Sequence, residues 1–430
     1  MGRLTVEVTD KNYDVVMIGG LITSYNYVKS AVKTIRDISR DTKIIVGGGI
    51  LTSIPHDMMR LLPEIDYGVM GEAYISLPNL LMQIGGDERT VKGIVIRDKT
   101  AGLYTTDPQP LIPDLDWLPF PSYGYAPLNI YFKNSSILMS EESMNARRRL
   151  DACFSLGCPF PCGYCWDLGL TSNVTRVGRP AGATLHRRNS PKYIAEYINR
   201  LQVGFNVDFV SWLDENVVAQ DVLSKDMWLR EIEIYLSERN LLPTQKYPVY
   251  HGGTAHPGLI KRETLKTLKR IGFTYLDYGL ESFSAKILKD LGKGTTPQKN
   301  KEAVQMTLEE GIQPIPNQMI MFPGETFETL GEMLDAWEEV GIVSKPFIVT
   351  PYPGSEWFNK YKPRIMAQYG NDLNKFLMDL GDATAVSALL TDNFTPAEAV
   401  GIQNIMADGA RTGNFSRARR LLALSNRSGS

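Results

Sequence analysis

The sequence of 430 residues has few cysteines and no long apolar run. No stretch of about 18 or more apolar residues occurs, which excludes a membrane-spanning helix. The N-terminus lacks the charged and then apolar pattern of a secretory signal, so we expect a cytoplasmic protein. The 4 cysteines all fall between residues 153 and 165. A disulfide framework would spread them through the fold, so their clustering indicates a metal site instead.

The sequence also lacks a large excess of charge of either sign. Its formal net charge is -2, with 22% charged and 43% hydrophobic residues. This balance gives no field that would recruit nucleic acid, and we expect no nucleic-acid partner. The composition is that of a globular protein, and the length favours two or three domains.

The first part of the chain alternates strand and helix patterns. Continuous apolar runs at 13–20, 43–49 and 65–72 are separated and followed by helical patterns at 25–38 and 77–84. Apolar strands that end in glycines and lead into helices indicate a parallel sheet covered on both faces. Ligands on such α/β sheets lie beyond the carboxyl ends of the strands. We therefore predict a Rossmann-like domain over residues 1–106.

Three further regions follow. Frequent prolines predict an irregular linker over residues 107–145. Strand and helix patterns resume over 146–355, and repeated units of this length form a barrel or part of one. The apolar runs lie at 209–213, 275–280, 315–322 and 347–350, with amphipathic helices such as 264–271 and 300–310 between them. Residues 356–430 have a helical pattern.

A loop in the third region holds Cys158, Cys162 and Cys165 at C-x3-C-x2-C spacing. A 4Fe-4S cluster normally takes four thiolates, so three would leave one iron with an open site. Structural zinc is the main chemical alternative, but no histidine lies near the loop to complete a zinc site. The thiols could also be small buried side chains, as free cysteines often are. The spacing, with prolines and a glycine between the thiols, favours a cluster.

This cysteine motif, with Tyr164 before its last cysteine, resembles the signature of the radical S-adenosylmethionine (SAM) superfamily. The resemblance covers about residues 150–355 and points to the subgroup often joined to cobalamin-binding domains. It continues in the segments 187–191, 213–216, 279–282, 322–326 and 350–354. The resemblance implies that the three cysteines bind a 4Fe-4S cluster and that the backbone beside Tyr164 contacts the adenine of SAM.

The resemblance also implies a partial barrel of six strand-helix units, with the cluster and SAM near the carboxyl ends of the strands. Glu281, at the end of the fourth strand, is then the best candidate for a side chain that contacts SAM. Asp214, which ends the second strand, is a candidate for SAM or substrate contact. The structural alternatives are a carboxylate at a helix N-terminus for Glu281 and a hydrogen-bond acceptor for Asp214.

Other polar residues near the barrel strands are weaker candidates. Thr254, His251 and His256 follow the third strand, where substrate or cofactor contacts would gather. Histidine transfers protons readily, but no partner carboxylate is identifiable for either one. Cys153 precedes the triad by five residues, and a buried position on the first strand is favoured over a role as a fourth ligand.

The N-terminal segment, including Gly48 and Gly49, resembles the second half of a cobalamin-binding domain over about residues 13–85. The Asp-x-His-x-x-Gly signature that supplies a cobalt ligand in many cobalamin proteins is absent, and His56 is expected at the surface at a helix start. The domain is shorter than in the family. Either cobalamin has been lost, or a partner protein completes the domain.

These resemblances imply an enzyme that cleaves SAM reductively to a 5'-deoxyadenosyl radical, with cobalamin-dependent methylation of an unactivated carbon as the main expectation. Radical cyclisation, coupling or rearrangement without cobalamin is the alternative, and a non-catalytic electron carrier or scaffold is the alternative of another class. Expected partners are a small-molecule or peptide substrate and an electron donor such as flavodoxin or ferredoxin. The expected cofactor contacts are Tyr164, Glu281, Asp214, Thr254, Gly48 and Gly49.

Overall fold

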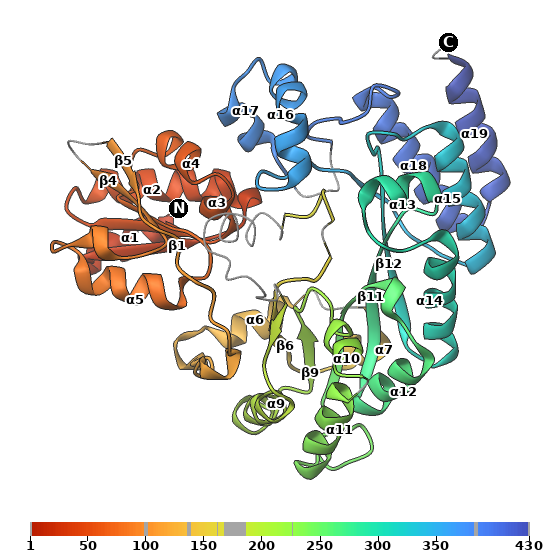
Figure 1. Cartoon of the computed structure of the whole chain (residues 1–430), viewed down its shortest axis with the longest axis horizontal. Helices are drawn as coiled ribbons and strands as arrows, with labels where there is room; N and C mark the ends of the chain where they lie inside the picture. Colours follow the sequence, from red (N-terminus) through yellow and green to blue (C-terminus); the bar gives the residue numbers. More distant parts are fainter. Residues whose placement is uncertain are drawn as a thin grey trace. The chain divides into compact units, whose positions relative to one another are not determined.

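The structure is a computed structural model that describes residues 2–98, 102–135, 139–160, 162–166, 186–225, 227–381 and 386–428 (Figure 1). The chain divides into two compact units, each described here by itself. The N-terminal unit contains Met1–Ile112, Pro161–Ala183 and Val349–Leu390, and the barrel unit contains Pro113–Phe160, Thr184–Ile348 and Thr391–Ser430. Each unit is assembled from three separate segments of the chain. These units are not the four contiguous regions expected from the sequence, and those regions stay a prediction.

The N-terminal unit is built on a five-stranded sheet in the order β1-β2-β3-β4-β5. The strands are β1 (Val15–Gly19), β2 (Lys43–Gly47), β3 (Tyr67–Val69), β4 (Ile94–Asp98) and β5 (Gly102–Thr105). The first three strands run parallel, and β4 and β5 pair antiparallel. The helices are α1 (Gly2–Lys11), α2 (Tyr25–Ile38), α3 (Gly49–Ser53), α4 (Pro55–Leu61), α5 (Ala73–Gln83), α16 (Glu356–Gln368) and α17 (Leu373–Asp379). The expected Rossmann-like region is confirmed.

Apolar side chains at strand and helix spacing form the core of this sheet. Ile45, Tyr67 and Ile94 pack with Leu80 of α5 on one face. The turn after β2 lies directly against the turn after β1, and Ile50 N donates to Gly20 O at 2.9 Å. Gly48 has φ +79°, and a Cβ there would lie 2.8 Å from Gly20 O. This close approach at the carboxyl ends of β1 and β2 therefore requires glycine.

The barrel unit is built on a curled six-stranded parallel sheet in the order β13-β12-β11-β10-β9-β6. The strands are β6 (Arg149–Ala152), β9 (Phe209–Trp212), β10 (Tyr250–Ala255), β11 (Phe273–Glu281), β12 (Gln313–Ile320) and β13 (Phe347–Ile348). A short antiparallel pair, β7 (Ser155–Leu156) and β8 (Arg187–Arg188), adjoins the cysteine loop. The expected partial barrel of six strands is confirmed.

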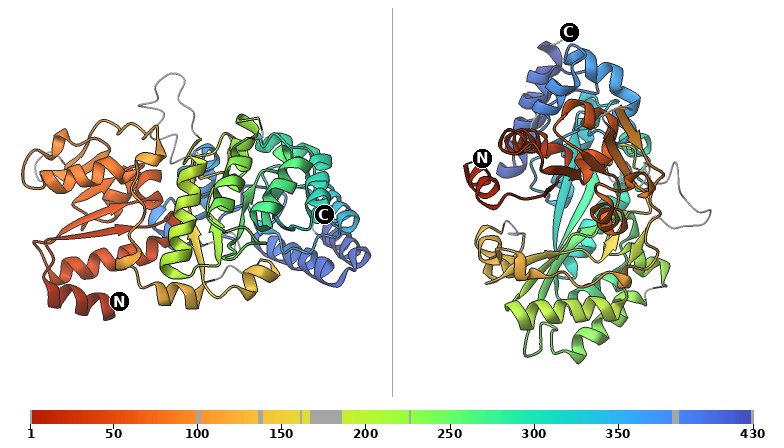
Figure 2. Two further views of the ribbon diagram at one scale, coloured as in Figure 1. Left: turned by 90° about the horizontal axis from the view of Figure 1, so that it is seen from below. Right: turned by 90° about the vertical axis from the view of Figure 1, so that its left-hand side faces the viewer.

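Helices lie along the outer side of this sheet (Figures 1 and 2). They are α9 (Pro191–Phe205), α10 (Ala219–Leu223), α11 (Trp228–Glu238), α12 (Arg262–Ile271), α13 (Ala285–Leu291), α14 (Pro297–Glu309) and α15 (Phe327–Val340). Two short helices, α6 (Leu128–Asn134) and α7 (Glu141–Asn145), precede the first strand, and α18 (Pro396–Thr412) and α19 (Phe415–Ser428) end the chain. None of the described helices is both long and apolar enough to cross a bilayer.

A buried carboxyl in the barrel unit makes stability depend on pH. Glu325 is 0% exposed and precedes α15, where the Thr329 hydroxyl donates to its Oε1. Burial raises the pKa of Glu325 from 4.5 to about 7. In the unfolded chain this group ionises near its usual pKa, so stability falls as pH rises from about 4.5 through about 7.

We therefore expect Glu325→Gln, which removes the ionisation, to raise the free energy of unfolding by about 1–3 kcal/mol at pH 8. Near pH 4 the gain should vanish, because the carboxyl is protonated in both states. Thermal unfolding of the variant and the wild type across this range measures the difference. A difference that did not change with pH would mean that Glu325 is not the titrating group.

Candidate active site

The three motif cysteines follow the short strand β7. Cys162 is 7% exposed, while Cys158 and Cys165 are half-buried. Cys165 N donates to Cys162 O at 3.0 Å, which forms a tight turn between them. Among the described residues, no three His, Cys, Asp or Glu side chains are grouped closely enough to hold a metal ion. The donor set fits a 4Fe-4S cluster chemically, and its ligation by these thiols stays a prediction.

His256 fixes the first half of the cysteine loop. Its ring stacks on Phe160, with centroids 3.8 Å apart and planes 7° apart. Its Nε2 donates to Lys293 O at 2.8 Å, and its Nδ1 accepts from Gly258 N at 3.1 Å. Burial, followed by the charge of Lys293, lowers the pKa of His256 to about 4, so the ring is neutral. Both nitrogens are occupied, which makes His256 a positioning residue for the loop.

Trp357 of α16 fixes the second half of the loop within the N-terminal unit. Its backbone N donates to Gly163 O at 2.9 Å, and its ring packs edge-on against Tyr164. A Cβ at Gly163 would lie 2.9 Å from Trp357 Nε1, so the motif glycine is needed for this packing. Trp357 lies almost two hundred residues along the chain, and no sequence pattern singled it out. The adenine contact beside Tyr164 stays a prediction.

A cavity of about 290 Å³ opens in the barrel unit near the carboxyl ends of β9, β10 and β11. It is lined by Met139, Ser211, Trp212, Leu213, Asp214, Glu215, Gly253, Thr254, Tyr275 and Asp277. Two sequence candidates, Asp214 and Thr254, are therefore brought together. Thr254 pairs in register with Asp277 of β11. Asp277 was not among the residues predicted from the sequence. The sequence feature that could have identified Asp277 is a charged residue inside an otherwise apolar strand.

The carboxyls of Asp214, which is buried, and Asp277, which is half-buried, are held differently in this cavity. Asp214 is 2% exposed, and its Oδ2 accepts from Phe154 N at 3.1 Å, which also agrees with the structural alternative. Burial raises the pKa of Asp214 to about 6. Asp277 accepts from Asn317 Nδ2 at 2.5 Å, and burial, followed by the charge of Glu281, raises its pKa to about 7. Both carboxyls therefore lie in surroundings that disfavour negative charge.

His251 does not reach this cavity's lining. It lies within β10 rather than after it, is 0% exposed, and accepts a hydrogen bond from Trp212 Nε1 at 3.3 Å. Its ring also packs against Phe273. Burial lowers the pKa of His251 to about 3. The structure therefore places it as a neutral core histidine. The expectation that His251 and Thr254 follow the third strand is wrong, because β10 runs to Ala255, whereas His256 does follow it.

Glu281 ends β11 as expected and forms a buried ion pair. Its Oε1 lies 2.7 Å from Lys293 Nζ, and the two side chains are 8% and 7% exposed. Glu281 has φ +59° at a bulge after Gly279, a backbone conformation that is costly for a residue with a Cβ. A Cβ at Gly279 would lie 2.6 Å from Glu281 Oε1. No helix begins at Glu281, and its contact with SAM stays a prediction.

Cys153 corrects one expectation. It comes directly after β6 and is exposed, whereas a buried strand position was expected. Its thiol donates to Ser155 O at 2.9 Å. The strand ends one residue earlier than the apolar pattern indicated, because the chain turns there into β7.

In the N-terminal unit, a pocket of about 230 Å³ lies at the carboxyl ends of β1 and β2. It is lined by Leu21, Ile22, Thr23, Gly49, Ser53, Trp166 and Tyr352, so Gly49 is where it was expected and Gly48 shapes the turn beside it. The lining residues that the structure describes are mainly apolar and include no His, Cys, Asp or Glu. Such a wall can contact one apolar face of cobalamin. It offers no side chain that would bind the cobalt. His56 is exposed, as expected, and is hydrogen-bonded to Thr105.

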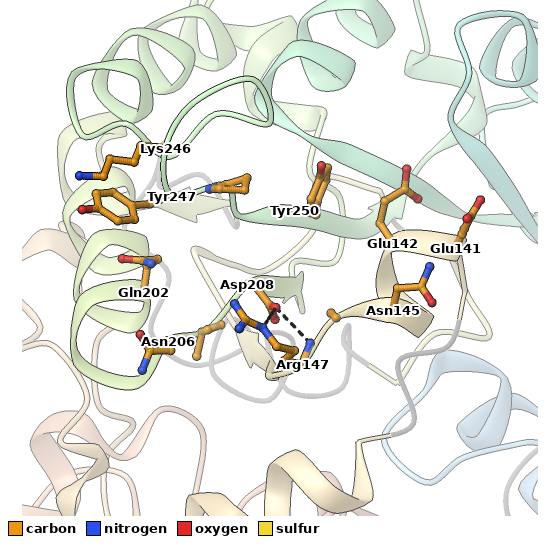
Figure 3. A pocket seen from close by; sticks show the side chains of 13 residues that line it. Glu141, Glu142, Asn145, Arg147, Gln202, Asn206, Asp208, Lys246, Tyr247 and Tyr250 are labelled. Carbon is orange, nitrogen blue, oxygen red and sulfur yellow. Dashed lines mark hydrogen bonds and ion pairs between the residues drawn. The ribbon is translucent and has the colours of Figure 1, made fainter.

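A larger pocket of about 520 Å³ lies at the opposite end of the barrel strands (Figure 3). Its residues lie before or at the starts of β6, β9 and β10, including Arg147, Asp208 and Tyr250. The Asp208 carboxylate accepts from the backbone N of Arg147 and Arg148 at 3.0 and 2.9 Å, so it joins two strand starts. Barrels place chemistry at the carboxyl ends of their strands and stability at the other end. We therefore assign this pocket a structural role.

A glycine shapes the barrel cavity and gives a testable effect. The Tyr275 ring crosses Gly252 so that its hydroxyl lies 3.0 Å from Ser211 Oγ, and a Cβ at Gly252 would lie 2.0 Å from the ring. Gly252→Ala should cost about 1–3 kcal/mol of unfolding free energy, because a rigid ring must move. Gly204→Ala, inside α9 with open space around it, should instead stabilise by about 0.5–1 kcal/mol. Urea unfolding of both variants measures this contrast, and equal effects would contradict it.

Comparison with known proteins assigns both units. Residues 153–336 match the model of the radical SAM superfamily, and residues 4–81 match that of the B12 binding domain. An uncharacterized methyltransferase of Pyrococcus horikoshii is 25% identical over 80% of this chain and 68% of its own length. The anaerobic magnesium-protoporphyrin IX monomethyl ester cyclase of Cereibacter sphaeroides is 23% identical over 84% of this chain and 55% of its own. The chain thus spans about half to two thirds of the length of these relatives.

Solved structures show the same fold. The radical SAM methyltransferase TsrM of Kitasatospora setae superposes with a TM-score of 0.65 at 15% identity, over 85% of this chain and 68% of that one. The cobalamin-dependent SAM radical enzyme OxsB gives 0.60 at 18% identity, over 84% and 48%. A radical SAM domain implies a 4Fe-4S cluster and SAM as cofactors, and the B12-binding match supports cobalamin as a third. The chain therefore belongs to the radical SAM superfamily, as an enzyme that carries a B12-binding domain before its barrel.

Proposed function

We propose that the protein is a cobalamin-dependent radical SAM methyltransferase that acts on an unactivated carbon. The observation that carries this proposal is the apolar pocket of the B12-binding region, whose lining includes Gly49 and Trp166, the residue after Cys165. The pocket that we propose for cobalamin thus includes a residue that directly follows the cysteine loop in the sequence. Similarity to methyltransferases supports the same activity.

When bound, the cluster and SAM would supply the chemistry for taking a hydrogen atom from the substrate, and cobalamin would supply the methyl group. The chain supplies placement. The loop with Cys158, Cys162 and Cys165 holds the cluster, and the backbone beside Tyr164 orients the adenine. Glu281, Thr254 and Asp214 contact SAM or the substrate at the carboxyl ends of the barrel strands. The cavity walls keep water from the reacting carbon.

Radical cyclisation is the second candidate. The specific observation in its favour is the similarity to three anaerobic magnesium-protoporphyrin IX monomethyl ester cyclases. On either function we expect a small-molecule or peptide substrate and an external donor such as flavodoxin or ferredoxin. A protein partner for the N-terminal unit also stays a prediction.

The test is an anaerobic assay of cluster-loaded protein with SAM and a strong reductant. We expect 5'-deoxyadenosine to form and cobalamin added to the protein to remain bound through gel filtration, as followed by its absorption spectrum. Thr23→Trp, which fills the apolar pocket, should release cobalamin, whereas Thr244→Trp on the exposed surface of the barrel unit should not. Deoxyadenosine without bound cobalamin would favour cyclisation. No deoxyadenosine from loaded protein would overturn both functions.

A further inference from the structure

The barrel cavity points to the chemical class of the substrate. Resting on the proposed function, we propose that the substrate carries a protonated amine, which Asp277 and Asp214 bind in the cavity between β9 and β11.

The charge of the cavity lining is the first observation. Three carboxyl side chains line it, those of the buried Asp214, the half-buried Asp277 and the exposed Glu215, and no Lys, Arg or His stands among the lining residues that the structure describes. The nearby Glu281 has its own cation in Lys293. Carboxylates that are withdrawn from water require a partner cation or a proton. A ligand with a positive group would provide that partner.

An unpartnered oxygen is the second and independent observation. Asp214 is 2% exposed, and its Oδ2 accepts from Phe154 N. Its Oδ1 has no hydrogen-bond partner of good geometry in the described part of the chain, and the nearby Ser155 hydroxyl and backbone offset only part of the effect of burial on the Asp214 pKa. A buried acceptor without a donor costs about 1–3 kcal/mol, and such groups are rare unless a ligand or water completes them. An ammonium group has three donors and no acceptor, so it matches an acceptor-only site.

The hydrogen bond from Asn317 adds geometry. Asn317 Nδ2 donates to Asp277 Oδ1 across from the neighbouring strand β12, which fixes the carboxyl plane at the cavity. This is the one hydrogen bond that the Asp277 carboxyl makes among the described residues, and it leaves Oδ2 for a ligand. The raised pKa of Asp277 fits a carboxyl whose counter-ion arrives with the ligand.

The remaining walls define the rest of the ligand. The ring of Tyr275 lines the cavity, and an ammonium group beside an aromatic face is stabilised further. A volume of about 290 Å³ suits a small amine or a single amine-bearing side chain. SAM itself carries a cationic amine and sulfonium, so the test must separate SAM from the substrate as the source of the cation.

Isothermal titration of the cluster-loaded holoenzyme tests the proposal with three probes at pH 8: phenethylamine, its neutral N-acetyl derivative and the anion 3-phenylpropionate. We expect the amine to bind at least about 10-fold more tightly than either analogue, since a charge-assisted hydrogen bond is worth about 1.5–3 kcal/mol. Asp277→Asn should weaken the amine about 10-fold or more while the Kd of SAM changes less than about twofold. Asp214→Asn should weaken the amine in the same direction.

Asp290→Asn, the same change on the exposed surface of α13, is the matched control and should leave the Kd of the amine unchanged. Equal binding of the three probes would overturn the proposal. So would an Asp277→Asn variant that loses SAM affinity as strongly as amine affinity, because the cavity would then serve SAM. A parallel deoxyadenosine assay separates the two proposals. SAM cleavage without amine selectivity rejects the substrate class alone, and amine binding without SAM cleavage rejects the enzymatic function alone.

Discussion

Replacing Cys162 with alanine is expected to lower 5'-deoxyadenosine formation by about 10²-fold or more, to the background of cluster-free protein. Cys162 is the most buried of the three motif thiols, so its loss removes a ligand that no solvent group can replace in the same position. The visible charge-transfer absorption of the reconstituted cluster should fall together with the formation of 5'-deoxyadenosine. Product quantification by chromatography and the absorption spectrum measure both effects on one sample.

Cys153→Ala is the matched control for this result. Cys153 is exposed and makes a hydrogen bond to Ser155 O, so its removal should leave cluster content and deoxyadenosine formation close to wild type. If Cys153→Ala lost the cluster while Cys162→Ala kept it, the assignment of the triad would be wrong. If both lost it, Cys153 would be a fourth ligand.

Breaking the Glu281–Lys293 ion pair is expected to have the largest effect on stability. Lys293→Met leaves the Glu281 carboxylate buried without its partner, which should cost about 3–5 kcal/mol of unfolding free energy. Replacing both residues, as in Glu281→Gln with Lys293→Met, should recover most of this loss, because neither charge remains. Thermal unfolding of the two single variants and the double variant measures the coupling.

The double variant also tests the role of Glu281 in binding SAM. If Glu281 contacts SAM, the stable double variant should still bind SAM about 10-fold more weakly than wild type. If the pair is only structural, SAM affinity should return together with stability. Additive losses in the two single variants would show that the charges are not coupled in the folded protein.

The sequence predicted the architecture well because its strands are marked by continuous apolar runs. The run at 275–280 lies within β11, and the helical pattern at 25–38 matches α2 residue for residue. Asp214 and Thr254 could be selected because they stand near the carboxyl ends of strands, a position that barrels use for chemistry. Local sequence patterns were therefore sufficient to identify the strands and helices, but they missed where β6 and β10 end.

Partners that are distant in the chain could not be predicted from local patterns. Lys293 pairs with Glu281 only because a helix after β11 returns the chain to the strand end. Asp277 is paired with Asn317 from the next strand, 40 residues away. The role of His251 depended on which face of β10 its side chain occupies, and Trp212 and Phe273 on the neighbouring strands decide that. Such contacts follow from sheet register, which a single sequence does not fix.

The stack of Phe160 on His256 has a consequence for cluster assembly. Ordering one backbone residue costs about 1–2 kcal/mol of conformational entropy, and a loop that carries three metal ligands would pay this cost when the cluster arrives. Here the barrel orders Phe160, one of the residues between the first two predicted ligands, during folding, through a neutral ring whose nitrogens are both occupied. We therefore expect metal loading to be coupled to a folded barrel, so that the unfolded chain competes poorly for iron.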